Sequence, residues 1–268
     1  MKRVVHIDAD IVLYSVGFAA EDDPIEYCCY SAKKLIQSII EATEADEYVL
    51  YLTGKTNFRD AVATLQPYKG NRELASKPIH YEALRSYLTK YHPFIESVDC
   101  EADDLLGIAC TADDGNINIL ASLDKDLNMI EGLHYNWRKK EDYTIYLEEA
   151  DLFFVEQLLT GDATDNIPGL KKITGHVASK KKKEYCREAP NFVEAIARVK
   201  ETYLSCHILS NPDMDEGALA QDVEVCLQEI GDLLWIRRTG FPTWRSYYEH
   251  CQANLSKEMV ESSEDGTE

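Results

Sequence analysis

The sequence predicts an α/β fold in which helices flank a central, mostly parallel sheet, followed by a C-terminal helical region. Short, almost continuously apolar segments typical of buried strands recur at residues 3–8, 47–53, 93–98 and 117–122. Segments with helical spacing of apolar residues lie between them. Strands that alternate with helices imply parallel strands with helices on both faces of the sheet.

The individual elements follow from local patterns. The segment at 31–45 has apolar residues at helical spacing, and Ser31 is placed to cap its start. A second helix is predicted at 78–91, with Pro78 in its first turn. A third, at 102–112, follows the third strand.

The second half of the chain has a different pattern. Residues 133–138 and 143–147 are predicted to form a late hairpin, after which every strongly periodic segment is helical. We therefore predict an α/β core at 1–150, a helical region at 151–255, and an acidic, disordered tail at 256–268.

Composition sets limits on function. The 268 residues include 45% hydrophobic residues, and the formal net charge is −20. That charge alone argues against a nucleic-acid binder, because phosphate contacts need local Lys and Arg. Net charge is a whole-chain average, however, and a basic stripe can be hidden within it.

The cysteines and the N-terminus indicate the compartment. The eight cysteines are scattered with no C-x-x-C pair, which favours reduced thiols. Asp8 interrupts the first apolar run, so the N-terminus does not read as a signal peptide. No apolar run approaches the roughly 18 residues of a membrane span. We expect a cytoplasmic protein without membrane contact.

Acidic residues follow the predicted strands or lie in turns. Ligands of parallel sheets bind beyond the carboxyl ends of the strands, so we expect at least three of these side chains to converge on one edge. The residues are Asp8 after the first strand, Glu101, Asp103 and Asp104 after the third, Asp124 and Asp126 after the fourth, and Asp162 and Asp165 in a Gly/Pro turn.

The clustered carboxylates predict a metal site. An Asp at a helix start, such as Asp103, is often only a cap or a partner of the helix dipole. Several acidic groups in one partly desolvated pocket repel one another, however, unless a cation neutralises them. Oxygen ligands without His or Cys favour Mg²⁺ or Mn²⁺. Two such ions about 4 Å apart form a clamp for phosphodiester hydrolysis.

Five motifs occur in the order seen in a known family. "IDAD", "YKGNR", "EADD", "LDKDL" and "GDATDNIPGLKKITGHVA" together resemble the flap endonucleases and 5′→3′ exonucleases. The similarity is closest to the bacteriophage members and to the nuclease domain of bacterial DNA polymerase I. It covers roughly residues 1–190 and implies the 5′ nuclease fold, which is PIN-like.

The resemblance implies residue roles. Lys69 and Arg72 would contact the scissile phosphate, and Tyr68 would stack on a base, which suits their chemistry. A surface turn is the alternative interpretation of "YKGNR". The first metal would be bound by Asp8, Glu101, Asp103 and Asp104, and the second by Asp124, Asp126, Asp162 and Asp165, with Asp8 and Asp124 also assigned to catalysis with Lys69 and Arg72.

Residues of about 160–187 resemble the family's helix–three-turn–helix, which grips duplex DNA. In that interpretation the two glycines allow close backbone approach to phosphates. The lysines supply a local basic patch, and a monovalent cation is a further candidate ligand there. A solvated helix face is the alternative for the lysine run. The residues concerned are Gly169, Gly175, Lys171, Lys172, Lys180 and Lys181.

Two departures from the family pattern stand out. The second strand of the family commonly leads into a metal-binding Asp, but this chain has Thr53 and Gly54 there. Asp10 is a candidate replacement if the first strand continues past Asp8, and a helix cap is the equal alternative. The segment 73–92 is also short for the helical arch that the family often has there, through which a single-stranded flap threads.

We predict a metal-dependent, structure-specific 5′ nuclease that cuts DNA at ends, flaps or gaps, recognising shape and backbone rather than sequence. Attack in line on the phosphodiester would leave a 5′-phosphate. RNA–DNA hybrids and replication proteins are further candidate partners, and phage replication or genome degradation is the expected setting. Three alternatives remain: a catalytically impaired DNA-junction binder, a haloacid-dehalogenase-type phosphatase, and an RNA-cleaving enzyme on a related sheet.

Overall fold

The computed structural model describes residues 1–72 and 76–264, which form two compact units. Unit 1 comprises Met1–Phe58, Arg72–Ala150 and Ile236–Thr239. Unit 2 comprises Arg59–Asn71, Asp151–Trp235 and Gly240–Glu268.

Unit 1 is built on a mixed sheet of six strands in the order β3-β2-β1-β4-β5-β6. All neighbouring pairs are parallel except β5 and β6, which form an antiparallel hairpin. The predicted mostly parallel sheet and the late hairpin are therefore confirmed. The strands are β1 (Arg3–Asp8), β2 (Glu47–Leu52), β3 (Phe94–Glu96), β4 (Ile117–Ala121), β5 (Gly132–Asn136) and β6 (Glu141–Ile145).

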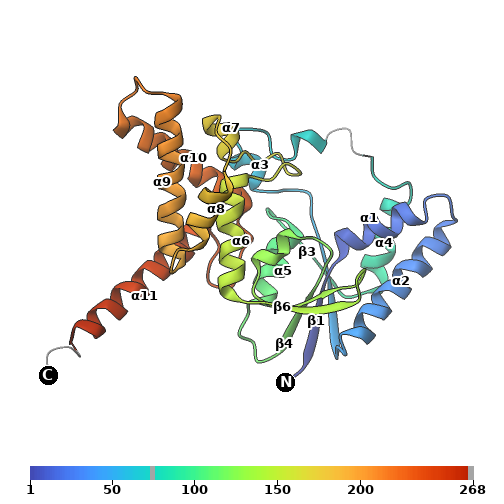
Figure 1. Ribbon diagram of the computed structural model, residues 1–268. Coiled ribbons are helices and arrows are strands. Elements are labelled where there is room, and N and C mark those ends of the chain that lie inside the picture. The colour runs from blue at the N-terminus through green and yellow to red at the C-terminus, as the bar shows by residue number, and fades with distance from the viewer. Residues whose placement is uncertain (73–75, 265–268) are drawn as a thin grey trace. The chain divides into compact units, whose positions relative to one another are not determined.

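Helices cover the sheet of unit 1 (Figure 1). Helix α1 (Ala9–Ala19) packs against β2 and against α2 (Ile25–Ala42) and α4 (Tyr81–Tyr91). Helix α5 (Ala102–Cys110) packs against β1, β2 and β4. In Figure 1, α2 and α4 lie on one side of the sheet and α5 lies on the other, as the alternating pattern predicted.

Two predicted helix starts are wrong. Helix α2 begins at Ile25 after Pro24, so Ser31 lies inside the helix rather than at its cap. The helix starts earlier than predicted because residues before Ser31, such as buried Cys28, also pack on the core. Helix α4 begins at Tyr81, and Pro78 belongs to the turn before it, where its carbonyl accepts the Tyr81 N–H. Within the candidate arch segment 73–92, residues 73–75 lie outside the described residues.

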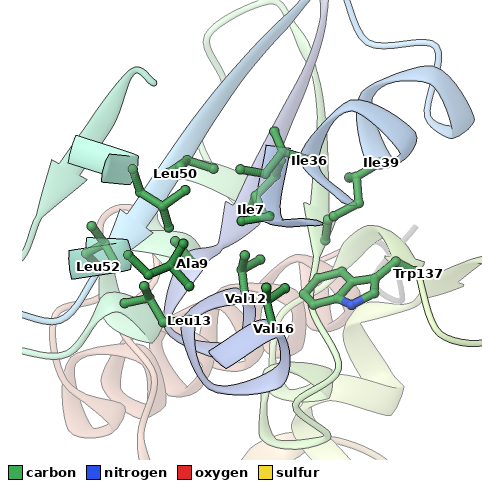
Figure 2. Close-up of a cluster of buried hydrophobic side chains, with 14 of the residues drawn as sticks. Ile7, Ala9, Val12, Leu13, Val16, Ile36, Ile39, Leu50, Leu52 and Trp137 are labelled. Atoms are coloured by element: carbon green, nitrogen blue, oxygen red, sulfur yellow. The ribbon is translucent and has the colours of Figure 1, made fainter. Parts of the chain in front are cut away.

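The core of unit 1 lies between β1 and β2 and the helices α1 and α2 (Figure 2). Ile7, Val12 and Leu13 are fully buried, and Val16 and Trp137 complete the same cluster. Burying each large apolar side chain contributes roughly 1.5–3 kcal/mol. Trp137 belongs to the turn between β5 and β6, and its side chain is part of the core, so it anchors this turn to the core.

Unit 2 is helical, as expected for the C-terminal region. An aromatic cluster that includes Phe154, Trp235 and Tyr247 fills its interior. Arg59 is buried and donates to the carbonyls of Leu233 and Trp235. The helices are α3 (Arg59–Val62), α6 (Leu147–Thr160, which enters the unit at Asp151), α7 (Leu170–Thr174), α8 (Lys180–Arg187), α9 (Phe192–Ser210), α10 (Glu216–Leu234) and α11 (Trp244–Glu264).

The last helix, the cysteines and the character of the helices bear on three further expectations from the sequence. Helix α11 continues through residues 256–264 of the expected acidic tail, and residues 265–268 lie outside the described part. All eight cysteines fall within the described residues and are free thiols. Of the helices in the described ranges, none combines the length and the apolar character that crossing a bilayer requires.

Candidate functional site

The first strand places Asp8 at the carboxyl edge of the sheet. The register pairs Ile7 with Ala121 of β4, so the next residues, Asp8 and Ser122, are neighbours. Ser122 Oγ donates to Asp8 Oδ2 at 2.6 Å and accepts the Asp124 N–H at 3.0 Å. Asp8 Oδ1 accepts the Ile11 N–H at 3.1 Å and thereby caps α1. One serine therefore joins the ends of β1 and β4.

Two carboxyl groups at this edge have raised pKa values. The pKa of Asp8 is raised to about 7, mainly by burial; the nearby carboxylates of Asp10 and Asp124 contribute to the rise, and the Ser122 hydrogen bond opposes it. Burial also raises the pKa of Asp10, and Glu101 adds to that rise. In unit 1, Asp8 therefore lies within electrostatic reach of Asp10 and Asp124, and Asp10 within reach of Glu101.

The first strand does not continue to Asp10; contacts with Thr53 and Arg85 fix the position of the Asp10 carboxylate. Strand β1 ends at Asp8, so Asp10 lies in the first turn of α1 and the cap is Asp8 itself. Asp10 Oδ2 accepts the Thr53 N–H at 3.0 Å, and Oδ1 lies 4.0 Å from Arg85 Nη1. Arg85 also pairs with Glu96 at 3.1 Å and donates to the Thr53 carbonyl. Asp10 Oδ1 is buried without a hydrogen-bond partner among the described residues.

The position of the missing family carboxylate is closed to a side chain. A Cβ at Gly54 would lie 2.0 Å from the Ser97 carbonyl oxygen, so this backbone admits only glycine there. The preceding residue, Thr53, makes two hydrogen bonds at this position. Its N–H donates to Asp10, and its Oγ1 accepts the Ala102 N–H at 3.0 Å. Thr53 thereby ties Asp10 to the start of α5.

The acidic start of α5 forms a capping box. The Glu101 side chain accepts the Asp104 N–H, and Asp104 Oδ2 accepts the Glu101 N–H at 3.1 Å. Asp104 is completely buried, and its Oδ1 accepts the Arg237 N–H at 3.2 Å. Asp104 therefore has a structural role, whereas Glu101 and Asp103 remain partly accessible.

Asp124 and Asp126 occupy the turn after β4. Asp124 Oδ1 accepts the Asp126 N–H at 2.9 Å, which orients the turn. Asp126 begins a short 3₁₀ turn, Asp126–Met129, and lies 3.3 Å from Lys125 Nζ. The D-x-D spacing thus brings two carboxylates to one turn.

The donor chemistry fits a divalent cation. The group consists of carboxylate oxygens, includes the unpartnered Asp10 Oδ1, and has raised pKa values that a bound cation would lower. Among the side chains that the structure describes, at residues 1–72 and 76–257, no three Asp, Glu, His or Cys side chains already stand in a metal-binding arrangement. The residues therefore fit an ion chemically, but their side chains are not arranged around one.

The remaining two acidic candidates lie in unit 2. Asp162 is buried, exchanges backbone hydrogen bonds with Ile167, and its Oδ1 accepts the N–H groups of Thr164 and Asp165. The loop is closed on itself by these bonds. Asp162 and Asp165 are therefore positioned by their own turn.

The "YKGNR" segment lies against this loop. Tyr68 OH donates to Asp165 Oδ2 at 2.9 Å, and Lys69 Nζ lies 3.7 Å from the same oxygen. The Lys69 N–H also donates to the Asp165 carbonyl. Arg72, three residues later, belongs to unit 1 and is exposed. The structure thus brings Tyr68, Lys69 and Asp165 together.

The glycines of the candidate DNA-binding hairpin have different roles. A Cβ at Gly169 would lie 2.2 Å from the Thr160 carbonyl carbon, so Gly169 is needed where the chain crosses itself. Gly175 has φ of 77° and ends α7 in the left-handed conformation with open space around it. Residues 175–179 join α7 to α8, which begins with Lys180 and Lys181. Lys172 Nζ donates to Gln66 at 2.7 Å, and Lys171 lies beside it in α7.

Two curated proteins are similar to this chain in sequence. The chain is 30% identical over 203 residues to DNA polymerase I of Bacillus caldotenax, a match covering 67% of this chain and 23% of that protein. It is 26% identical over 198 residues to a 5′-3′ exonuclease of Buchnera aphidicola subsp. Schizaphis graminum, covering 64% of this chain and 67% of that protein. By these two relatives, the chain resembles the 5′ nuclease family. It spans about a quarter of the length of the polymerase.

Solved structures of 5′ nucleases share the fold. The bacteriophage T5 5′-exonuclease with bound zinc aligns over 97% of this chain and 99% of its own, with a TM-score of 0.61 and 18% identity. A T5 flap endonuclease complex with DNA and metal ions covers 85% of this chain and all of its own, with a TM-score of 0.56 and 19% identity. No family model matches the chain.

Three residues that position this group of carboxylates were not predicted from the sequence. Ser122 was treated as the last residue of a strand and Thr53 only as a departure from the family, and Arg85 was assigned no role. The position of Ser122 two residues before Asp124 was the available signal, since a short hydroxyl side chain there can reach the backbone of its own turn. Nothing in the sequence indicated the Arg85–Asp10 pair.

Proposed function

We propose that the chain is a divalent-metal-dependent 5′ nuclease that hydrolyses phosphodiester bonds in DNA. The observation that carries this proposal is the pair of carboxyl groups Asp8 and Asp10 at one edge of the sheet, whose pKa values are raised by burial and further by the neighbouring carboxylates of Asp124 and Glu101. The Buchnera relative is named a 5′-3′ exonuclease, and the T5 structures hold metal ions and DNA, which supports the same activity here.

Bound divalent ions would neutralise the phosphate and promote the ionisation of water near neutral pH. The residues of the chain have distinct tasks. Asp8, Glu101 and Asp124 would bind the ion, and Ser122 holds Asp8 and the Asp124 backbone in place. Arg85 and Thr53 would position Asp10. Lys69 and Arg72 are the proposed phosphate contacts, and Tyr68 the proposed stacking surface.

The finer assignments remain predictions. They comprise the use of two ions, their identity as Mg²⁺ or Mn²⁺, the metal role of Asp103, Asp126, Asp162 and Asp165, and a monovalent cation near α7 and α8. The helix–three-turn–helix grip, the RNA–DNA hybrid and replication-protein partners, and a phage setting are also proposals.

A non-catalytic DNA-junction binder is the second candidate. It is favoured by Thr53 and Gly54, since Gly54 leaves no room for the carboxylate that the family commonly places there. Both candidates bind DNA, but only the nuclease cuts it.

The decisive experiment uses a 5′-labelled flap and a blunt duplex incubated with Mg²⁺, Mn²⁺ or chelator, followed by sizing of the products. We expect metal-dependent cleavage by the wild-type protein and none by Asp124→Asn with Asp126→Asn. Asn at 124 retains the Oδ1 acceptor for the Asp126 N–H, so the turn is preserved.

Asp113→Asn is the matched control, because Asp113 is exposed and lies before β4, at the opposite end of the strand. It should cut as the wild type does. Binding of gapped DNA without cleavage in Mn²⁺ would favour the junction binder, and full activity of the double variant would refute the metal assignment.

A further inference from the structure

A polar cavity in unit 1 is lined by Asp124 of the carboxylate group and extends from it to residues that have no part in that group. Its volume is about 360 Å³, and its walls come from the turn after β4 and from the β5–β6 hairpin. This volume lies within the range of small-ligand sites, about 300–1,000 Å³. Its polar and charged lining residues include Asp124, Asn128, Asn136, Lys139, Glu141 and Tyr143.

Two amide side chains on this wall are oriented by the protein. Tyr143 OH donates to Asn128 Oδ1 at 3.2 Å, and burial raises the pKa of Tyr143, so its hydroxyl stays protonated. Asn136 Oδ1 accepts the N–H groups of Arg138 and Lys139 at 3.1 and 3.0 Å. Both amide oxygens are therefore occupied, which leaves the Nδ2 groups as donors.

Those donors have no protein acceptor. Within the described residues, neither the Asn128 Nδ2 nor the Asn136 Nδ2 group has a hydrogen-bond partner, and Lys139 Nζ has no ion pair. An amide NH₂ pair and an ammonium group are donors only, and they suit the oxygen atoms of a phosphate.

The hairpin turn holds these groups in place. Trp137 inserts beside Val12 and Val16 in the core, as Figure 2 shows, and it directly follows Asn136. The β5 strand runs parallel to β4, so this turn lies at the same sheet edge as Asp124. The turn also carries three consecutive cations, Arg138, Lys139 and Lys140, in a chain of net charge −20.

We propose that this cavity binds a phosphate, with its attached nucleotide, of the nucleic-acid strand that the carboxylate site acts on. Asn128, Asn136 and Lys139 donate to the phosphate oxygens, and Asp124 marks the side of the cavity nearest the cleavage centre. Glu141 lies on the exposed rim and repels the strand. This proposal rests on the proposed nuclease function. It adds that the substrate is a nucleic-acid strand long enough to extend from the carboxylate group into this cavity.

Variants of the three donors test the proposal by fluorescence anisotropy of a labelled flap DNA in Ca²⁺. Asn128→Asp and Asn136→Asp keep the acceptor oxygen that each turn needs but replace the donor by a negative charge. We expect each to weaken binding about tenfold or more, because a hydrogen bond to a charged group is lost and repulsion is added. Lys139→Ala should reduce the slope of log affinity against log salt concentration by about 0.9.

Arg138→Ala is the matched control, since Arg138 neighbours Lys139 in the turn but does not line the cavity. It should change affinity less than Lys139→Ala does. Equal losses for Arg138→Ala and Lys139→Ala would overturn the cavity assignment and leave only a general attraction. Unchanged binding by the two Asn variants would overturn it as well.

A second measurement separates this inference from the nuclease proposal. The side-chain amide signals of Asn128 and Asn136 are followed by ¹⁵N NMR while a 5′-phosphorylated thymidine dinucleotide is added. Saturable shifts in the wild type that vanish in Lys139→Ala support the cavity even if the protein cuts no DNA. Cleavage by the wild type without any shift or binding loss in the variants would refute the cavity alone.

Discussion

Replacement of Asp8 by Asn should stabilise the metal-free protein at mildly alkaline pH. Burial raises the pKa of this carboxyl to about 7, and the carboxylates of Asp10 and Asp124 contribute to the rise. Above that pH the wild-type protein has a buried negative charge that its neighbours repel. Asn is uncharged and retains an oxygen for the Ile11 N–H that caps α1.

The magnitude follows from the shift. The rise from the ordinary value of 3.8 to about 7 spans about three units, which at about 1.36 kcal/mol per unit is about 4 kcal/mol. The native state binds this proton more tightly than the unfolded state, so the wild-type free energy of unfolding falls as pH rises between about 4 and 7. The variant lacks this term. The stability difference should therefore be small near pH 4 and largest near pH 8.

The assay is urea unfolding in EDTA at several pH values, followed by tryptophan fluorescence. Asp113→Asn serves as control for the loss of one exposed charge. Added Mg²⁺ should stabilise the wild type more than Asp8→Asn, because it binds the native carboxylates. A variant that is no more stable than the wild type near pH 8 in EDTA would refute the electrostatic reasoning.

Two further predictions concern the rest of the chain. Gly107→Ala should destabilise unit 1 by about 1–3 kcal/mol in urea unfolding, because the new Cβ would lie 2.3 Å from the Arg237 carbonyl oxygen; an unchanged midpoint would contradict this packing. Lys171→Ala with Lys172→Ala should weaken duplex binding equally for all sequences and lower the salt slope by up to about two, measured by anisotropy. A loss confined to some sequences would argue against a backbone contact.

Much of the sheet could be predicted because its strands are short, apolar and β-branched. Residues 3–8 gave the first strand with its observed bounds, and the acidic residues after β1, β3 and β4 followed from the topology alone. Strand polarity determines which end of a parallel sheet carries the loops, so an Asp at the end of one strand implies proximity to that after another. That reasoning needed no side-chain detail.

The details that failed depend on tertiary contacts. Helix α1 was not predicted because apolar residues also occupy its exposed side, at Tyr14 and Phe18, so the buried face of Val12, Leu13 and Val16 does not stand out as a stripe. The exclusion of a side chain at Gly54 depends on Ser97, which is remote in sequence. Gly169 was assigned to phosphate approach, but its observed need is the crossing with Thr160. Such long-range approaches leave no periodic signal.

The Arg85 guanidinium gives one end of the carboxylate group a permanent countercharge. It is largely buried and is covalently part of the chain. A chelator that strips divalent ions cannot remove it. Depletion of metal should therefore leave Asp10 partly compensated and concentrate the uncompensated charge on Asp8 and Asp124, so the two ends of the group are expected to respond unequally to the supply of ions.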